Sequence, residues 1–361
     1  MDAKKETFNA SVDDQLTGNK TETPQKNDLL SFCIPTYNHA EPLRKNLESL
    51  IPQARQYNIP IYVSDNASTD HTIKVLESFQ KDYPLLYFKS NKENLGVDQN
   101  MVNAVRMAST KYVWTFGARR ILLPGMLNRI YKMLNESDWD LIVLNDLDTS
   151  FMVPESKEYN SAGEVFRELN RNLTGLGFQI LPSEAWTTES ILKYAGTEWT
   201  IFGVALEFLA NKKNVKVFFM PEPCATSTGP SHWTPRCFQI WASWKKVIYS
   251  LPKIYSDDDK EFVLKKSINY FLGPKYNLTF NLINLRINHI YNVDVFNAYR
   301  QDFTHYGDIS PAVASIIARC PVLLLKLYFK LYNVLRETAR IFVHVKVPLN
   351  PTKRRGRIPY V

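Results

Sequence analysis

Short apolar runs alternate with segments of helical spacing over residues 29–145. The runs cover residues 29–34, 59–63, 85–88, 112–116 and 141–144. In the segments between them, large apolar residues recur every three or four positions, as Leu43, Leu47 and Leu50 do. Strand and helix in alternation predict an α/β fold with a mainly parallel sheet, right-handed crossovers and helices on both faces.

Four strand-to-loop junctions are expected to share the edge at the carboxyl ends of these strands. Ligands bind at that edge in sheets of this kind. Asn38 and the run Ser68-Thr69-Asp70 are predicted to accept the free amide hydrogens at the starts of the helices that follow them. The four junctions are Pro35-Thr36-Tyr37-Asn38, Ser64-Asp65-Asn66, residues 90–96 and Gly117-Ala118-Arg119-Arg120.

The junctions offer specific polar chemistry. No Gly-x-Gly-x-x-Gly sequence follows the first strand and no Gly-Lys-Ser/Thr loop is present, which disfavours dinucleotide and P-loop sites. Asp65 can accept the imide hydrogen of a pyrimidine base, and Tyr37 can flank the ring. Asn94 with Gly96 allows close approach of the backbone. An aspartate in this position also serves as a turn or helix-capping residue, and the spacing favours neither role for Asp65.

Four motifs follow one another at these junctions: SFCIPTYN, VSDNASTD, ENLGVDQN and KYVWTFG, the last followed by ILLPGML. In this order they resemble the motifs of family 2 inverting glycosyltransferases with the Rossmann-like GT-A fold, and among them the enzymes that build bacterial surface polysaccharides. The resemblance covers residues 29–145 and continues more weakly to about residue 233. It implies a nucleotide-sugar donor and a saccharide acceptor, which a membrane lipid can carry, and the Asp65 carboxylate favours a UDP- or dTDP-sugar as that donor. The residues expected at the donor are Pro35, Thr36, Tyr37, Asn38, Asp65, Asn66, Asn94, Gly96, Asn100, Gly117 and His232.

The sequence departs from the family after the fourth strand. The family usually places an aspartate-rich metal motif there, whereas this chain has Ala118-Arg119-Arg120, which cannot coordinate a hard cation. No metal ligand and no cofactor are therefore predicted, although Mg or Mn at Asp146-Leu147-Asp148 stays a weaker alternative to an ordinary turn. Guanidinium groups hold their charge and suit phosphate oxygens, so Arg119 and Arg120 are predicted to stabilise the leaving diphosphate without metal. The alternative is a catalytically impaired or engineered protein that binds nucleotide sugars or acts as a scaffold.

An inverting displacement also needs a carboxylate that takes the proton of the acceptor hydroxyl. Glu198 precedes a helix predicted over residues 201–210 and is the candidate base, with Glu207 and Asp98 as alternatives. A carboxylate at a helix start is also favoured by the helix dipole alone. His232 is expected to contact a diphosphate oxygen.

The chain is predicted to consist of four segments. Residues 1–28 form a polar, disordered tail, and residues 29–145 form the donor-binding half of the GT-A domain. Residues 146–236 form its acceptor-binding half, and residues 237–361 form a helical extension. The first residues contain no apolar segment typical of a signal peptide, and the four cysteines are widely separated, which favours a cytoplasmic protein.

The net charge of +8 is concentrated at the C-terminus. From Pro311 onward ten basic residues and one acid give +9, so the first 310 residues carry −1. This distribution does not favour nucleic-acid binding, which needs basic charge on the folded body. A wide apolar face with a narrow basic stripe is typical of a helix on an anionic membrane surface, so we expect a peripheral protein on the inner face of the membrane. The alternative is packing of that face on the chain's own body. The polar stripe comprises Arg319, Lys326, Lys330, Asn333, Glu337, Arg340 and His344.

Overall fold

The computed structural model describes residues 26–147, 155–229, 234–272, 278–307, 309–328, 330–332 and 334. The chain divides into two compact units. Unit 1 comprises Met1–Glu158, Arg171–Thr188 and Lys216–Thr228, and unit 2 comprises Tyr159–Asn170, Glu189–Val215 and Gly229–Val361. The predicted acceptor-binding segment, 146–236, is therefore shared between the two units. Nearly all of the predicted tail lies outside the described residues.

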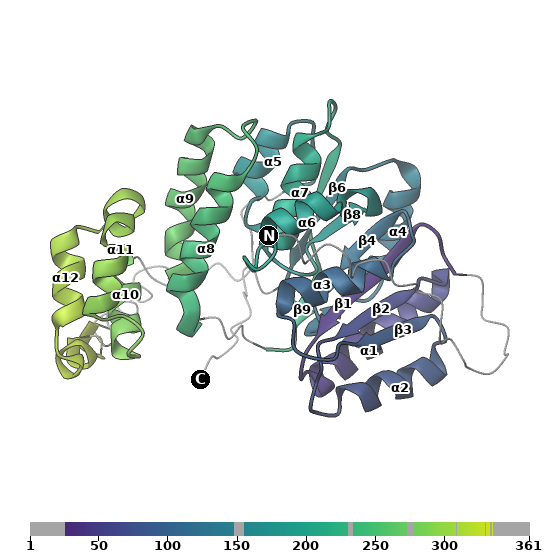
Figure 1. Ribbon diagram of the computed structural model, residues 1–361, viewed down its shortest axis with the longest axis horizontal. Helices are drawn as coiled ribbons and strands as arrows, with labels where there is room; N and C mark the ends of the chain where they lie inside the picture. The colour runs from purple at the N-terminus through teal and green to yellow at the C-terminus, as the bar shows by residue number, and fades with distance from the viewer. Residues whose placement is uncertain are drawn as a thin grey trace, which may run out of the picture. The chain divides into compact units, whose positions relative to one another are not determined.

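Unit 1 contains a mixed sheet in the order β3-β2-β1-β4-β8-β6-β9-β5, with β7 paired to β9 off this path (Figure 1). β1, β2, β3 and β4 run parallel to one another, and the predicted alternation of strand and helix is confirmed. β8 is antiparallel to β4 and β6, which makes the sheet mixed. The strands are β1 (Leu30–Thr36), β2 (Ile61–Asp65), β3 (Leu86–Ser90), β4 (Tyr112–Thr115), β5 (Arg120–Leu122), β6 (Leu141–Asp146), β7 (Lys157–Tyr159), β8 (Gln179–Pro182) and β9 (Val217–Ser227).

Helices cover both faces of this sheet because alternate strand residues point to opposite sides. Phe32 of β1 belongs to the large core under α1 (Ala40–Ala54), α2 (Thr72–Asp82) and α4 (Met126–Glu136), where its ring stacks on Trp114 at 4.8 Å. Its neighbour Cys33 belongs to a smaller cluster with Val105 of α3 (Val97–Arg106). The strand register aligns Thr36 with Asp65 and Asp65 with Ser90, so the three carboxyl-terminal loops meet at one edge.

Unit 2 is helical. Trp199, Trp244 and Phe271 form part of its core, with ring centroids 5.0 Å apart for the two tryptophans. Its helices are α5 (Ala162–Leu169), α6 (Thr188–Tyr194, which begins at the boundary), α7 (Thr200–Ala210), α8 (Cys237–Ser250), α9 (Asp257–Leu272), α10 (Leu278–Ile287), α11 (Val293–Tyr306), α12 (Pro311–Arg319) and a last helix, Val322–Tyr332. The predicted C-terminal helical extension is confirmed.

The predicted basic stripe is not continuous. α12 ends at Arg319, and Val322–Tyr332 leaves it at an angle of 112°. Pro321 causes the break, since proline lacks an amide hydrogen and forces Cys320 before it into an extended conformation (φ −61°, ψ 136°). Arg319 therefore does not share a helix with Lys326, and the prediction of one helix was wrong here. Residues Asn333, Glu337, Arg340 and His344 of the stripe lie outside the described residues.

Over the described ranges, no single helix is long and apolar enough to cross a membrane. The bent pair formed by α12 and Val322–Tyr332 passes that test of length and composition only when both helices are counted together.

Candidate functional site

The loops that follow β1 and β2 hold each other in place. The Asn38 side chain accepts the Thr69 amide hydrogen at 2.7 Å, and the Asn38 amide donates to the Ser68 hydroxyl at 2.8 Å. Asp70 accepts the Thr72 amide at the start of α2, as predicted, and also the Ala40 amide at the start of α1. Asn38 does not cap its own helix, so that prediction was wrong: the cap of α1 comes from the neighbouring loop.

A network of asparagine amides joins the ends of β1, β2 and β3. Asn100, buried in α3, donates to the carbonyl oxygens of Thr36 and Ser64 at 3.1 and 3.0 Å. Asn91 donates to the side-chain oxygens of Asn66 and Asn100, both at 3.0 Å. Asn66 also donates to Asn94 at 2.7 Å. Asn66, Asn94 and Asn100 were predicted to bind the sugar donor, and their amide groups hold the loops together. Any contact with the sugar donor comes in addition to this structural role.

Asp65 ends β2 and is fully buried. Its Oδ2 accepts the Ser90 hydroxyl at 2.7 Å and the Ser68 amide at 3.1 Å, so the role of a turn aspartate is real. Its Oδ1 is buried and has no donor within the described residues. A buried carboxylate oxygen without a partner is costly, which makes Oδ1 an unexplained acceptor at this edge, beside the hydroxyl oxygen of Thr36, which also has no partner among the described residues.

The remaining residues of these loops differ in exposure. Tyr37 is 40% exposed, whereas Pro35 and Thr36 belong to the buried strand β1. Gly96 has a φ of +82° and nothing within 4 Å of the position of a Cβ atom. Glycine suits the left-handed backbone that starts α3, and the close approach of this backbone to a ligand stays a prediction.

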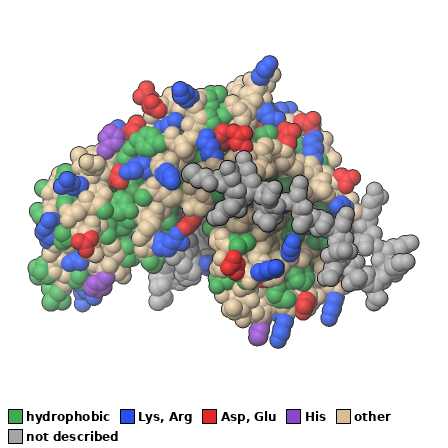
Figure 2. Space-filling view, viewed as in Figure 1, with side chains coloured by type: hydrophobic (Ala, Val, Ile, Leu, Met, Phe, Trp, Pro, Cys, Tyr) green, Lys and Arg blue, Asp and Glu red, His purple; other side chains and the backbone are tan. Residues whose placement is uncertain are grey.

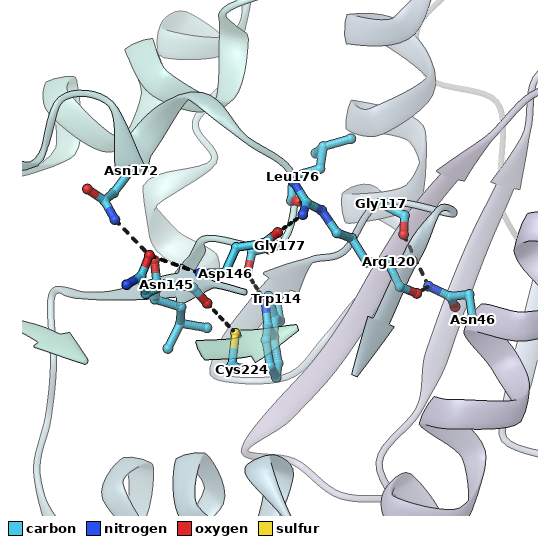
Figure 3. Close-up of polar contacts among 11 residues, drawn as sticks. Asn46, Trp114, Gly117, Arg120, Asn145, Asp146, Asn172, Leu176, Gly177 and Cys224 are labelled. Carbon is cyan, nitrogen blue, oxygen red and sulfur yellow. Dashed lines mark hydrogen bonds and ion pairs between the residues drawn. The ribbon is translucent and has the colours of Figure 1, made fainter. Parts of the chain in front are cut away.

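Arg120 begins β5 and binds the interior of unit 1. Its guanidinium, 19% exposed, forms an ion pair with the fully buried carboxylate of Asp146 at the end of β6. Nε donates to the Leu176 carbonyl oxygen at 3.1 Å, and the guanidinium carbon lies 4.6 Å from the centre of the Phe178 ring. Figure 3 shows Arg120 extending toward Leu176. These contacts join the turn after β4 to β6 and to the loop before β8.

The turn that carries the two arginines is held by hydrogen bonds from α1. Asn46 is buried and donates to the carbonyl oxygens of Gly117 and Arg120 at 3.1 and 2.7 Å (Figure 3). Arg119 is half-buried, and its carbonyl oxygen accepts the Thr228 amide at 2.9 Å. Arg119 lies in the turn and Arg120 begins β5, so the two side chains leave backbone of different conformation.

No group of three or more His, Cys, Asp or Glu side chains in the described part of the chain is placed to hold a metal ion. The residues present do not suit one here: Ala118, Arg119 and Arg120 carry no side-chain oxygen, and Asp146 is bound to Arg120. Asp148 lies outside the described residues.

The candidate base lies in unit 2. Glu198 has a φ of +67° just before α7, and its carboxylate forms an ion pair with Arg236. Its rival Glu207 binds Lys193 and accepts the Tyr194 hydroxyl at 2.7 Å, and Asp98 is buried at the start of α3. His232 lies outside the described residues. The roles of all four stay predictions.

Two structural residues escaped the sequence analysis. Asn46 stands among Leu43, Leu47 and Leu50 on the apolar face of α1, and a polar side chain in that position was the available signal. Asn91 directly follows β3 and lies inside the predicted loop, yet its links to Asn66 and Asn100 depend on the fold.

The Asp70 cap gives a prediction about pH. Burial alone would raise the pKa of Asp70, but hydrogen bonds from Thr72 and from the Ala40 amide lower it below the ordinary value. A lowered pKa in the folded state stabilises the fold above the pKa of the unfolded chain, and this stabilisation is lost as the pH falls through the folded pKa. Asp70→Ala is expected to cost about 1 kcal/mol at neutral pH, measured by urea unfolding, and less below about pH 4. A cost that stays constant with pH would contradict this role of the charge.

Comparison with known proteins shows which family part of this chain resembles. Residues 31–183 match the model described as glycosyl transferase family 2. Abequosyltransferase RfbV of Salmonella typhimurium is 32% identical over 155 residues, which are 39% of this chain and 46% of the relative. A GalNAc(5)-diNAcBac-PP-undecaprenol beta-1,3-glucosyltransferase of Campylobacter jejuni is 32% identical over 108 residues, 30% of this chain and 35% of that one. Each match spans less than half of the relative's length.

Solved structures show the same fold. The crystal structure of S. aureus TarS 1-349 has a TM-score of 0.54 and 15% sequence identity, and the match covers 80% of this chain and 90% of that chain. The complex of the same fragment with UDP-GlcNAc gives a TM-score of 0.51 at 15% identity, covering 80% and 91%. The GT-A architecture expected from the motifs is confirmed.

Proposed function

Because residues 31–183 match the model of glycosyl transferase family 2, we propose that the chain is a member of this family and moves a sugar from a UDP- or dTDP-sugar to a saccharide acceptor with inversion of configuration. The acceptor is carried on a membrane lipid, and the reaction belongs to the synthesis of a surface polysaccharide. The protein works at the cytoplasmic face of the membrane. An enzyme with this activity needs no nucleic acid.

One observation carries the donor assignment: Oδ1 of Asp65 is a buried carboxylate oxygen without a partner among the described residues, at the carboxyl ends of parallel strands. The N3–H of uracil or thymine is a donor that this oxygen can accept. N3 of cytosine carries no hydrogen, so the proposal predicts that the site prefers uracil and thymine nucleotides to cytosine nucleotides. The structural neighbour TarS, which binds UDP-GlcNAc and UDP, supports a uridine donor by analogy of fold.

The lipid-linked acceptor is supported by the relatives. The Campylobacter jejuni protein is named for an acceptor on undecaprenol, and RfbV is named for abequosyl transfer. The matches to these relatives cover only 39% and 30% of this chain, so the acceptor does not follow from these matches alone. The two relatives are named for the transfer of different sugars, so they do not identify the sugar that this chain transfers.

We assign the stabilisation of negative charge on the leaving diphosphate to the turn after β4. Arg120 already neutralises Asp146, so we assign the direct contact with phosphate to Arg119 and the fixing of the turn to Arg120. A planar guanidinium can bind two phosphate oxygens at once and needs no metal for its charge. The residues of this turn do not fit a metal, so no step of the proposed reaction passes through one.

The general base is assigned to Glu198. Its carboxylate forms an ion pair with Arg236, and a carboxylate can accept a proton from a hydroxyl group. Glu198 has a positive φ, a backbone conformation that residues other than glycine rarely adopt. Such conformations occur often at functional positions.

The experiment that tests this function measures nucleotide binding by calorimetry, followed by donor hydrolysis and transfer. UDP and dTDP are expected to bind more tightly than CDP and ADP. Asp65→Asn keeps the side-chain shape but can turn an N–H toward the imide hydrogen, so UDP affinity is expected to fall about 10- to 100-fold. Ser90→Ala, which removes only a donor to Oδ2, is the matched control and is expected to weaken binding far less.

Three outcomes are informative. Equal affinity of the parent protein and Asp65→Asn for UDP would remove the donor assignment. Binding without hydrolysis or transfer would favour the alternative, a nucleotide-sugar-binding scaffold. Glu198→Gln is expected to keep donor binding and to lose sugar transfer. If this variant still transfers the sugar, the general base is another carboxylate.

A further inference from the structure

The last described helix, Val322–Tyr332, has its apolar residues on the outside. It packs on unit 2 through Leu325, which is 7% exposed, and through Tyr332, whose ring lies 4.3 Å from that of Phe280 in α10. A helix of a water-soluble protein turns such a stripe inward and presents polar residues outward. Here the inward stripe is narrow, and most of the leucines lie elsewhere.

Four leucines of this helix are turned to the solvent. At about 100° per residue they fall within an arc of roughly 100°, on the side away from Leu325 and Tyr332. α12 adds Val313 and Ile316, which are 40% and 66% exposed. Figure 2 shows hydrophobic side chains with Lys and Arg among them over the part of unit 2 that holds α12. The leucines are Leu323, Leu324, Leu327 and Leu331, with exposed fractions of 69%, 56%, 57% and 60%.

Basic side chains border this apolar surface. Lys326 and Lys330 are exposed and lie within roughly 60° of the leucine arc on its edge. Arg319 ends α12, where its guanidinium lies over the Phe296 ring at 5.7 Å. The sequence from Pro311 to Val334 contains no acidic residue. A long lysine side chain can keep its ammonium group at the level of lipid phosphates while its stem covers apolar surface.

The geometry excludes a simple span. The two helices meet at 112°, and each is too short to cross a bilayer alone. An exposed apolar surface that is bordered by one sign of charge fits a surface of opposite charge with an apolar interior. Anionic phospholipid has both properties, whereas a protein partner would have to supply a matching acidic rim.

We propose that α12 and Val322–Tyr332 form a membrane-docking hairpin that lies in an anionic phospholipid surface, with Leu323, Leu327 and Leu331 among the acyl chains. Lys326 and Lys330 bind the phosphate groups. The inference rests on the proposed function in one respect: a lipid-linked acceptor is reached from such a surface. The inference specifies which described residues contact the lipid. Among the basic residues it assigns this contact to Lys326 and Lys330, and not to Arg319, which lies on α12.

The experiment is co-sedimentation of the full-length protein with vesicles of phosphatidylcholine, alone or mixed with phosphatidylglycerol. The parent protein is expected to bind the mixed vesicles, less tightly as salt is added. Leu323→Ser with Leu327→Ser and Leu331→Ser is expected to lower the partition coefficient by about a hundredfold or more. Lys326→Glu with Lys330→Glu is expected to remove the preference for phosphatidylglycerol, a loss of at least about twentyfold.

Leu192→Ser is the matched control, because Leu192 is also 69% exposed but lies on α6. It is expected to leave vesicle binding unchanged. The inference is overturned if the triple serine variant binds vesicles like the parent. It is also overturned if the parent does not bind the mixed vesicles. If light scattering then shows that the triple variant turns a dimer into a monomer, a second copy of the chain covers the leucines.

Donor hydrolysis in free solution separates this inference from the proposed function. All of these variants are expected to hydrolyse a soluble donor like the parent, since none is altered in unit 1. Vesicle binding without donor hydrolysis would contradict the enzyme and leave the docking hairpin standing.

Discussion

Replacing Arg120 with methionine is expected to lower the free energy of unfolding by about 3–5 kcal/mol. The substitution keeps most of the apolar stem but leaves the carboxylate of Asp146, which is fully buried, without its counter-charge. It also removes the hydrogen bond to the Leu176 carbonyl oxygen. Chemical unfolding followed by circular dichroism measures the loss.

Two variants make this result specific. Arg129→Met removes an exposed ion pair with Glu222 and is expected to cost at most about 1 kcal/mol. Arg120→Met combined with Asp146→Leu removes both charges and is expected to recover most of the stability, because apolar residues often replace a buried pair without loss. If Arg120→Met cost no more than Arg129→Met, the ion pair with Asp146 would not hold the fold.

Arg119→Ala is expected to lower sugar transfer by about a thousandfold while the protein stays folded. An arginine that binds a phosphate leaving group contributes on this scale in phosphoryl transfer, and Arg119 is only half-buried. Initial rates of transfer with the donor at saturation measure the effect, and the free energy of unfolding should change by no more than about 1 kcal/mol.

Arg44→Ala, on the exposed side of α1, is the control and should keep full activity. Addition of a chelator to the parent protein is expected to leave the rate unchanged, since the turn after β4 offers no ligand for a metal. Loss of activity on chelation, or an active Arg119→Ala variant, would remove arginine from the reaction and favour a metal site elsewhere.

The local pattern predicted the sheet well, and the reason is physical. The strands β1, β2 and β4 are buried along their whole length, so they appear as apolar runs, and the helices between the strands bury one stripe each, as Leu43 and Leu47 do. Parallel order then follows from the length of the crossovers. The ends were displaced by one or two residues: β1 extends to Thr36 and β2 to Asp65, since their last residues are polar but still paired.

The contacts between distant residues could not be predicted in the same way. Asp70 caps a helix that begins 30 residues earlier, and Asn46 binds a turn more than 70 residues later. The sequence analysis gave Arg119 and Arg120 the same role, because nothing in the local sequence shows that Arg120 alone pairs with Asp146. The break at Pro321 was visible, but the regular basic spacing across it favoured one helix.

The ion pair between Arg120 and Asp146 also limits how this protein can change over generations. Neither residue can mutate first without leaving the other charge buried and unmatched, so the two sites are expected to be epistatic. A descendant that regained acidic residues in the turn would have to lose Arg120 and would place new carboxylates beside Asp146. Such a lineage must acquire a cation and the acidic residues together, which makes the present arrangement difficult to reverse in single steps.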